Sequence, residues 1–152
     1  MKDIYNYIDK NIEEYVSDLQ ELIRKPSVSA QNIGLEECAE FVKSQMHKDG
    51  LPAELHEIPG GPPLVFGHLK SSLSKKTLFC YSHYDVQPPE PIEKWSHGGP
   101  WSGALVNNVI YGRGATDNKG GLLAFNKAAK AKTEKLSILF SYVDVEIAVF
   151  YV

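Results

Sequence analysis

Apolar residues recur with the period of an α-helix in two segments near the start of the chain. Over residues 2–24 the apolar positions recur at steps of three and four: Ile4, Ile8, Ile12, Tyr15, Leu19, Leu22 and Ile23. This spacing is typical of an amphipathic helix with one buried face, and Pro26 ends it. A second helix is predicted from about Gly34 to Lys48, with its apolar side facing inward and Gly50 as its stop: Cys38, Phe41, Val42 and Met46.

The pattern changes to that of strands after residue 50. "AELHEI" (53–58) alternates between apolar and polar residues, which predicts a half-buried strand. "PLVFGHL" (63–69) and "TLFCYSH" (77–83) predict two more strands, the latter apolar enough for the centre of a sheet. Residues 84–108, rich in Pro, Gly and Trp, predict a long loop, and "NVIYGRG" (108–114) predicts a short strand that breaks into glycines.

The last part of the chain combines a helix with a strongly β-forming segment. Residues 117–133 are rich in Ala and Lys and predict a helix, and "LSILFSYVDVEIAVFYV" (136–152) predicts one or two strands. The latter is too short and, with Asp144 and Glu146, too charged for a membrane span. Helices that alternate with apolar strands predict an α/β fold, with a sheet covered by helices on both faces.

The bulk properties narrow the class of protein. A length of 152 residues suits one domain with a real core. A net charge of -3 and a pI of about 5.9 give no indication of a nucleic-acid or anionic-membrane partner. The acidic, amphipathic N-terminus does not resemble a signal peptide. Cys38 and Cys80 lack CxxC spacing, so we expect two buried free thiols and a cytoplasmic protein.

His83 and Asp85 follow the most apolar predicted strand. In extended backbone, residues two apart point to the same side. A metal-bound imidazole usually donates its other N–H to a carboxylate, so the spacing suits a metal ligand with an orienting partner. The alternative is a histidine at the strand end and an Asx turn at Asp85 before the prolines, and the triplet alone favours this second interpretation.

Asp117 lies in "YGRGATDNKGG" (111–121), between a short strand and a predicted helix. One interpretation is a helix N-cap, since Asp is among the best residues there. A nucleotide-binding loop is excluded, because Gly112 and Gly114 lack the third glycine of GxGxxG and no GxxxxGK[ST] is present. An ionised Asp can instead bridge two divalent cations about 3.5–4 Å apart.

Taken together, "SHYDVQP", the spacer with Trp95 and Trp101, and "YGRGATDNKGG" resemble the M20 family of dinuclear zinc peptidases. That family includes cytosolic dipeptidases, aminoacylase, succinyl-diaminopimelate desuccinylases and glutamate carboxypeptidases, and "HYDVQPPEP" looks most like the dipeptidase branch. The resemblance implies a three-layer α-β-α zinc-peptidase-like catalytic domain. It covers residues 1–131, and residues 132–152 form a β-rich tail that departs from the family pattern.

The resemblance also implies roles for individual residues. His83 would be a ligand of one Zn²⁺, Asp85 the catalytic carboxylate that orients it, and Asp117 the ligand that bridges two Zn²⁺ ions, with Mn²⁺ or Co²⁺ as alternatives. The Asp117–Asn118 peptide would be cis, as in relatives. Substrates would be small peptides or N-acyl amino acids. A homodimer is typical of the family, but its dimerisation domain is absent from this sequence.

Other parts of the family pattern are not visible in this sequence. The family's Glu-Glu pair, which supplies the general base and a ligand, would fall at about Tyr151 and Val152, and the later Asp and final His are missing. Asp144 and Glu146 are expected to be solvated strand residues rather than substitutes. Three hypotheses therefore stay open: a dipeptidase- or carboxypeptidase-like hydrolase that is inactive as this truncated chain, an N-acyl amino acid deacylase, and a non-catalytic pseudoenzyme remnant.

The remaining polar and aromatic residues near these motifs are expected to be structural. The other histidines are interpreted as surface or edge residues, and Trp95 and Trp101 as packing residues. Arg113 is expected to pair with a nearby acid.

Overall fold

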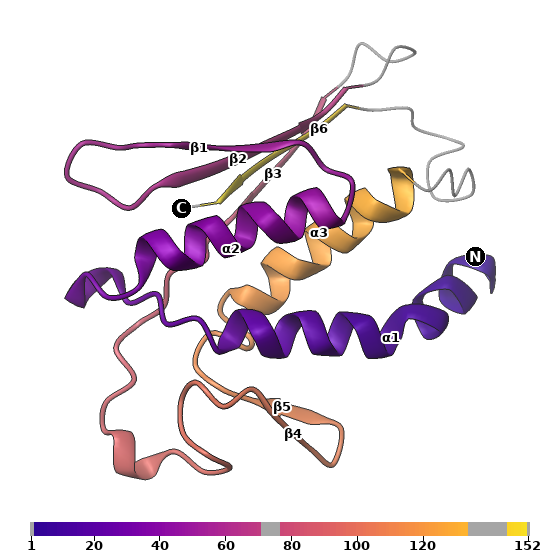
Figure 1. The fold of residues 1–152 in the computed structure, drawn as a ribbon. Coiled ribbons are helices and arrows are strands. Elements are labelled where there is room, and N and C mark those ends of the chain that lie inside the picture. Colours follow the sequence, from indigo (N-terminus) through magenta and orange to yellow (C-terminus); the bar gives the residue numbers. More distant parts are fainter. Residues whose placement is uncertain (1, 71–76, 134–145, 152) are drawn as a thin grey trace.

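The computed structural model describes residues 2–70, 77–133 and 146–151, and these form an α/β domain (Figure 1). Its helices are α1 (Lys2–Ile23), α2 (Leu35–Lys48) and α3 (Lys119–Thr133). Its strands are β1 (Ala53–His56), β2 (Leu64–Leu69), β3 (Thr77–Ser82), β4 (Ala104–Val106), β5 (Val109–Tyr111) and β6 (Glu146–Tyr151). No helix within these ranges is long and apolar enough to cross a membrane.

The main sheet has the strand order β1-β2-β6-β3. β6 runs antiparallel to β2 and parallel to β3, so that Tyr151 pairs with both Val65 and Ser82. The parallel neighbours β3 and β6 are joined through α3, because parallel strands need a long crossover. β4 and β5 form a separate hairpin at the opposite end of the molecule from the sheet (Figure 1).

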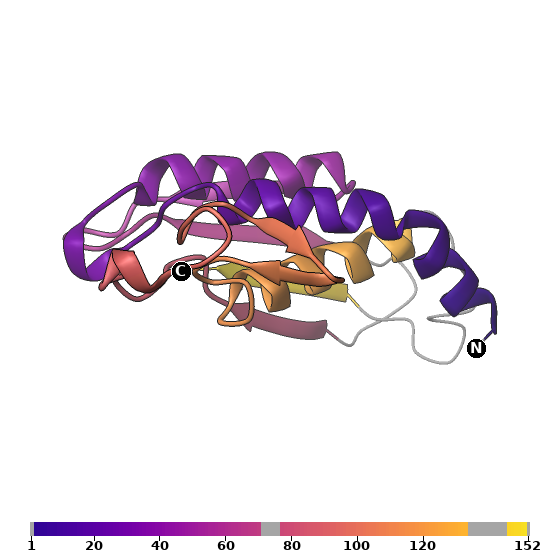
Figure 2. The ribbon, with the colours of Figure 1, turned by 90° about the horizontal axis from the view of Figure 1, so that it is seen from below.

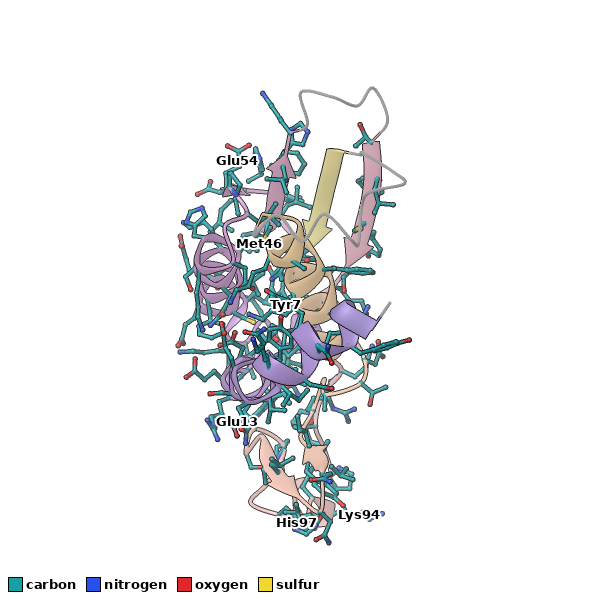
Figure 3. The ribbon with its side chains drawn as sticks, turned by 90° about the vertical axis from the view of Figure 1, so that its right-hand side faces the viewer. Tyr7, Glu13, Met46, Glu54, Lys94 and His97 are labelled. Carbon is teal, nitrogen blue, oxygen red and sulfur yellow. The ribbon has the colours of Figure 1, made fainter. Side chains whose placement is uncertain are left out.

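The core lies between the sheet and two helices on the same face. Gly67 of β2 lies directly against Met46 of α2, and Figure 3 shows Met46 between α2 and the sheet. Tyr151, paired with Val65 in β2, donates a hydrogen bond to Asn126 Oδ1 of α3 at 2.7 Å. Paired residues share a face, so α2 and α3 both cover this one. Figure 2 shows the helices together on one side of the sheet.

The opposite face of β3 carries exposed aromatic side chains. Phe79 and Tyr81 are 59% and 60% exposed, whereas the neighbouring Ser82 is buried with the helices. The predicted α/β class is confirmed. The predicted cover on both faces is not found in the described residues, where the helices that contact the sheet share one of its faces.

The predicted helices and strands agree with the structure, with one additional strand, but β3, which was expected at the centre of the sheet, lies at the edge of the described sheet. α1, α2 and α3 begin and end within two residues of the predicted bounds. The loop predicted over residues 84–108 contains β4, which the pattern missed because Leu105 and Val106 are an isolated apolar pair. Asn107 and Asn108 both have positive φ (50° and 62°), as the two-residue turns that favour hairpins require. Asp144 lies outside the described residues.

Candidate metal site

His83 follows the last residue of β3, and its ring is held by Asp85. His83 Nδ1 lies 3.0 Å from Asp85 Oδ1, and the other carboxylate oxygen, Oδ2, accepts a hydrogen bond from Ser29 Oγ. Both side chains are about one-third exposed, at 30% and 31%. Because Nδ1 is engaged by the carboxylate, Nε2 is the ring nitrogen that faces other partners.

Asp117 comes to this imidazole from the loop that opens α3. Its Oδ1 lies 3.2 Å from His83 Nε2, and its side chain is 81% exposed. The Asp117–Asn118 peptide is cis in the structure, which agrees with the resemblance. Gly114 allows the loop to pass close by: its φ is +87°, and a Cβ there would lie 2.7 Å from Val86 Cγ1. A side chain at Gly114 would push the Asp117 loop away from the segment that carries His83.

The spacing of the pair suits a divalent cation. Two ligand atoms about 2.0–2.1 Å from a tetrahedral Zn²⁺ lie roughly 3.3 Å apart. The 3.2 Å between His83 Nε2 and Asp117 Oδ1 matches that edge. An imidazole nitrogen and a carboxylate oxygen are also ligand types that zinc accepts. The pair therefore fits a metal, and the assigned roles stay predictions.

A third ligand is not found beside this pair in the described part of the chain. Within residues 2–70, 77–133 and 146–151, one group of three potential metal ligands (His, Cys, Asp or Glu) lies close together. Its members are Glu14, Asp18 and Asp49. β6 ends beside His83, because Tyr151 pairs with Ser82. Glu146 pairs with Thr77 at the other end of the strands, about 16 Å away at the rise of a β-strand. Glu146 therefore cannot replace the family's acidic pair.

The acidic group around Asp18 is occupied by lysines instead. Lys127 Nζ donates to Asp18 Oδ2 and to both oxygens of Asp49, at 2.8 and 2.9 Å, and Lys48 donates to Asp18 Oδ1 at 2.7 Å. Burial alone would raise the pKa of Asp18, but the hydrogen bonds from Lys127 and Lys48 outweigh it and hold that pKa below its ordinary value. The cluster is an ion-pair network that joins α1, α2 and α3, and its ligand atoms already serve ammonium groups.

Comparisons with known proteins agree with the motifs. The family model "Peptidase family M20/M25/M40" matches residues 79–143. A Cys-Gly metallodipeptidase of Schizosaccharomyces pombe is 36% identical over 144 residues, which cover 86% of this chain and 30% of that protein. A succinyl-diaminopimelate desuccinylase of Hahella chejuensis is 34% identical over 115 residues, covering 76% of this chain and 28% of that protein.

Solved structures show the same relationship. An M20 family metallo-carboxypeptidase from Sulfolobus solfataricus superposes with a TM-score of 0.81 at 37% identity, covering 91% of this chain and 30% of that chain. The chain belongs to the M20 peptidase family. It spans about 30% of the length of the M20 relatives that it matches.

Two residues beside the M20 motifs were missed by sequence reasoning. Ser29 donates a hydrogen bond to Asp85, and no spacing pattern in the sequence predicts this contact. Lys119 is completely buried, and its Nζ donates to the backbone oxygens of Leu22 and Lys25. Burial lowers the pKa of Lys119. A signal for Lys119 existed, because a cation in the first turn of a helix opposes the helix dipole and calls for a reason.

The other singled-out residues of this M20 chain have structural contacts. His97 packs against the ring of Tyr111 at 4.2 Å, far from the sheet (Figure 3). The Arg113 guanidinium lies 5.1 Å from the centre of the Trp95 ring and donates to Pro88 O at 3.2 Å. The acid partner expected for Arg113 is not found in the described residues.

Proposed function

We propose that this chain contributes His83, Asp85 and Asp117 to a zinc-dependent amide hydrolase site of the M20 type. The substrates would be dipeptides or similarly small amides. The single observation that carries the proposal is the approach of His83 Nε2 to Asp117 Oδ1, at 3.2 Å, with Asp85 behind the ring. The M20 relatives named as metallodipeptidase and metallo-carboxypeptidase support this reaction class.

Each of these residues has a distinct task. Asp85 accepts the Nδ1–H of His83, which fixes the tautomer and presents Nε2 to an ion. Asp117 would share that ion through one oxygen, and its high exposure leaves the other oxygen for a second ion. A bound divalent ion supplies a water of lowered pKa and polarises a carbonyl group.

A deacylase acting on N-acyl amino acids is the second candidate. The similarity to the Hahella chejuensis desuccinylase supports this candidate, because the same metal site would then hydrolyse the amide bond of a succinylated amino acid. A non-catalytic remnant is the third. It is favoured by the lack of a third ligand beside His83 in the described residues, since a catalytic zinc normally has three protein ligands. Loss of a general base commonly costs about 10²–10⁴-fold in rate.

One experiment separates these candidates. Zn²⁺ and Mn²⁺ binding is measured by calorimetry. The same sample is assayed with Cys-Gly, β-Ala-His and succinyl-diaminopimelate, the substrates in the names of relatives. His83→Ala is expected to weaken metal binding at least tenfold, and Asp85→Asn by about 10–100-fold. His56→Ala is the matched control, because His56 lies on β1 and contacts Glu54.

Each outcome has a clear meaning. Equal metal affinity in His83→Ala and the unmodified chain would refute the ligand assignment. Two-metal binding with turnover would exclude the remnant hypothesis, and the preferred substrate would separate dipeptidase from deacylase. Metal binding without turnover would favour the remnant.

We further propose that the protein is cytoplasmic. Cys38 and Cys80 are both free, which suits a reducing compartment, although only Cys38 is buried as expected and Cys80 is partly exposed. The homodimer that the family resemblance implies stays a prediction, which the molecular mass in solution would test.

A further inference from the structure

Lys119 is buried without an acidic partner in the described residues. Its side chain is 0% exposed, and its Nζ lies 3.0 Å from Leu22 O and 2.5 Å from Lys25 O. The ring of Trp101 is 5.9 Å away. A buried ammonium is costly unless its hydrogen bonds are satisfied, so this position calls for a physical reason.

The reason is found at the end of α1. The last carbonyl groups of a helix lack partners within it and carry the negative end of its dipole. From the first turn of α3, two residues after Asp117, Lys119 donates to one of these groups, Leu22 O, and to Lys25 O, two residues beyond the end of α1. One cation therefore fastens the start of α3 to the end of α1.

The same stretch of chain also holds the other half of the site. We call residues 22–29 the α1 junction. Its Ser27 Oγ donates to Tyr84 O at 2.7 Å, and Ser27 O accepts from the N–H of Val86 at 2.8 Å. Its Ser29 contacts Asp85. The segment that carries His83 and the loop that carries Asp117 are thus attached to one junction, from two sides.

We infer that Lys119 is a positioning residue that sets the place of Asp117 relative to His83 through the α1 junction. This inference rests on the proposed function in so far as the pair binds a metal. The Nζ of Lys119 is engaged by backbone oxygens of the α1 junction, so Lys119 is not itself a candidate ligand. It acts by keeping the two side chains at the separation that a shared ion requires.

The test compares Lys119→Met with the matched control Lys130→Met. Methionine keeps the length of the apolar stem but removes the donor. Lys130 lies three turns further along α3 and donates to Glu14 at 2.7 Å, away from the α1 junction. The first measurement is hydrogen exchange without metal, at the amides of Lys119 (bonded to Gly114 O) and Val86. The second is titration with Co²⁺, followed by its visible absorption spectrum.

In Lys119→Met we expect both amides to exchange about tenfold faster or more, whereas the Leu51 amide, bonded to Met46 O, keeps its rate. We expect Co²⁺ affinity to fall by about 10–100-fold, with a changed spectrum. Lys130→Met should show neither effect. If Lys119→Met does not fold, Lys119→Gln, which keeps an N–H donor one bond shorter, serves in its place with smaller effects.

The outcomes separate this inference from the proposed function. Unchanged exchange and Co²⁺ affinity in a folded Lys119 variant would overturn the inference, as would equal losses in Lys130→Met. If the unmodified chain binds no Co²⁺ at His83, the proposed function fails. The exchange rates then still decide whether Lys119 positions the Asp117 loop.

Discussion

The ion-pair network around Lys127 gives the sharpest prediction about stability. Lys127 is 6% exposed, and its partners Asp18 and Asp49 are 3% and 0% exposed. In Lys127→Met the side chain keeps nearly its volume, but the ammonium is lost. Asp18 retains Lys48, whereas Asp49 retains only Lys130 among its ion-pair partners in the described residues, at 3.7 Å.

The size of the effect follows from the burial of Asp49. Removing one partner of a buried ion pair costs about 3–5 kcal/mol, because the other charge is left without compensation. Domains of this size are stable by about 5–15 kcal/mol. Lys127→Met should therefore remove a large part of the free energy of unfolding. Asp49→Asn in the Lys127→Met background should recover roughly 1–3 kcal/mol, because it removes the unpaired charge.

Urea unfolding of the unmodified chain, both single variants and the double variant measures these changes as a double-mutant cycle. A loss below about 1 kcal/mol in Lys127→Met, or additive losses in the double variant, would refute the reasoning. A divalent cation that stabilised the unmodified chain equally in the His83→Ala background would also contradict it, since the ammonium groups should exclude metal from this cluster.

Three further predictions concern acid stability, the last strand and the glycine loop. The pKa of Asp18 lies below its ordinary value of 3.8, so the ionised carboxylate stabilises the fold above pH 3.8. This stabilisation is lost as the pH falls through 3.8 and below it, and unfolding midpoints measured between pH 7 and 3 will show the loss. Tyr151→Phe should cost about 1–3 kcal/mol in urea unfolding, because Asn126 loses a buried donor at 2.7 Å; an unchanged midpoint would argue against packing of β6 on α3. Gly114→Ala should weaken Co²⁺ binding, since the added Cβ meets Val86 Cγ1 at 2.7 Å, whereas Gly60→Ala, with φ of +75° and no atom within 4 Å, controls for backbone strain alone.

Periodicity and motifs predicted most of the elements, because each is dominated by local signals. The apolar steps of α1 and the uniform apolar run of β3 needed no tertiary information. The hairpin of β4 was missed because it is short and its turn residues, Asn107 and Asn108, were assigned to a long loop. The proposed division of the chain at residue 131 stays a prediction.

The candidate site was predictable only where sequence spacing encodes geometry. His83 and Asp85 lie two residues apart on extended backbone, so their proximity follows from the chain itself. Asp117 was brought to them by resemblance, since no local rule places residues 34 positions apart in contact. Ser29 and Lys119 reach the site from other elements, and only the folded arrangement reveals them.

The position of β6 has a consequence for how the sheet is made. β6 contains the last described residues of the chain, yet it lies between β2 and β3. Until it has been synthesised, the β1–β2 hairpin and β3 have no common hydrogen-bonding neighbour, so the sheet consists of two separate parts. Removal of residues 146–151 would therefore remove an inner strand of the sheet rather than an edge strand. It would also detach the strand that presents His83 from the rest of the sheet.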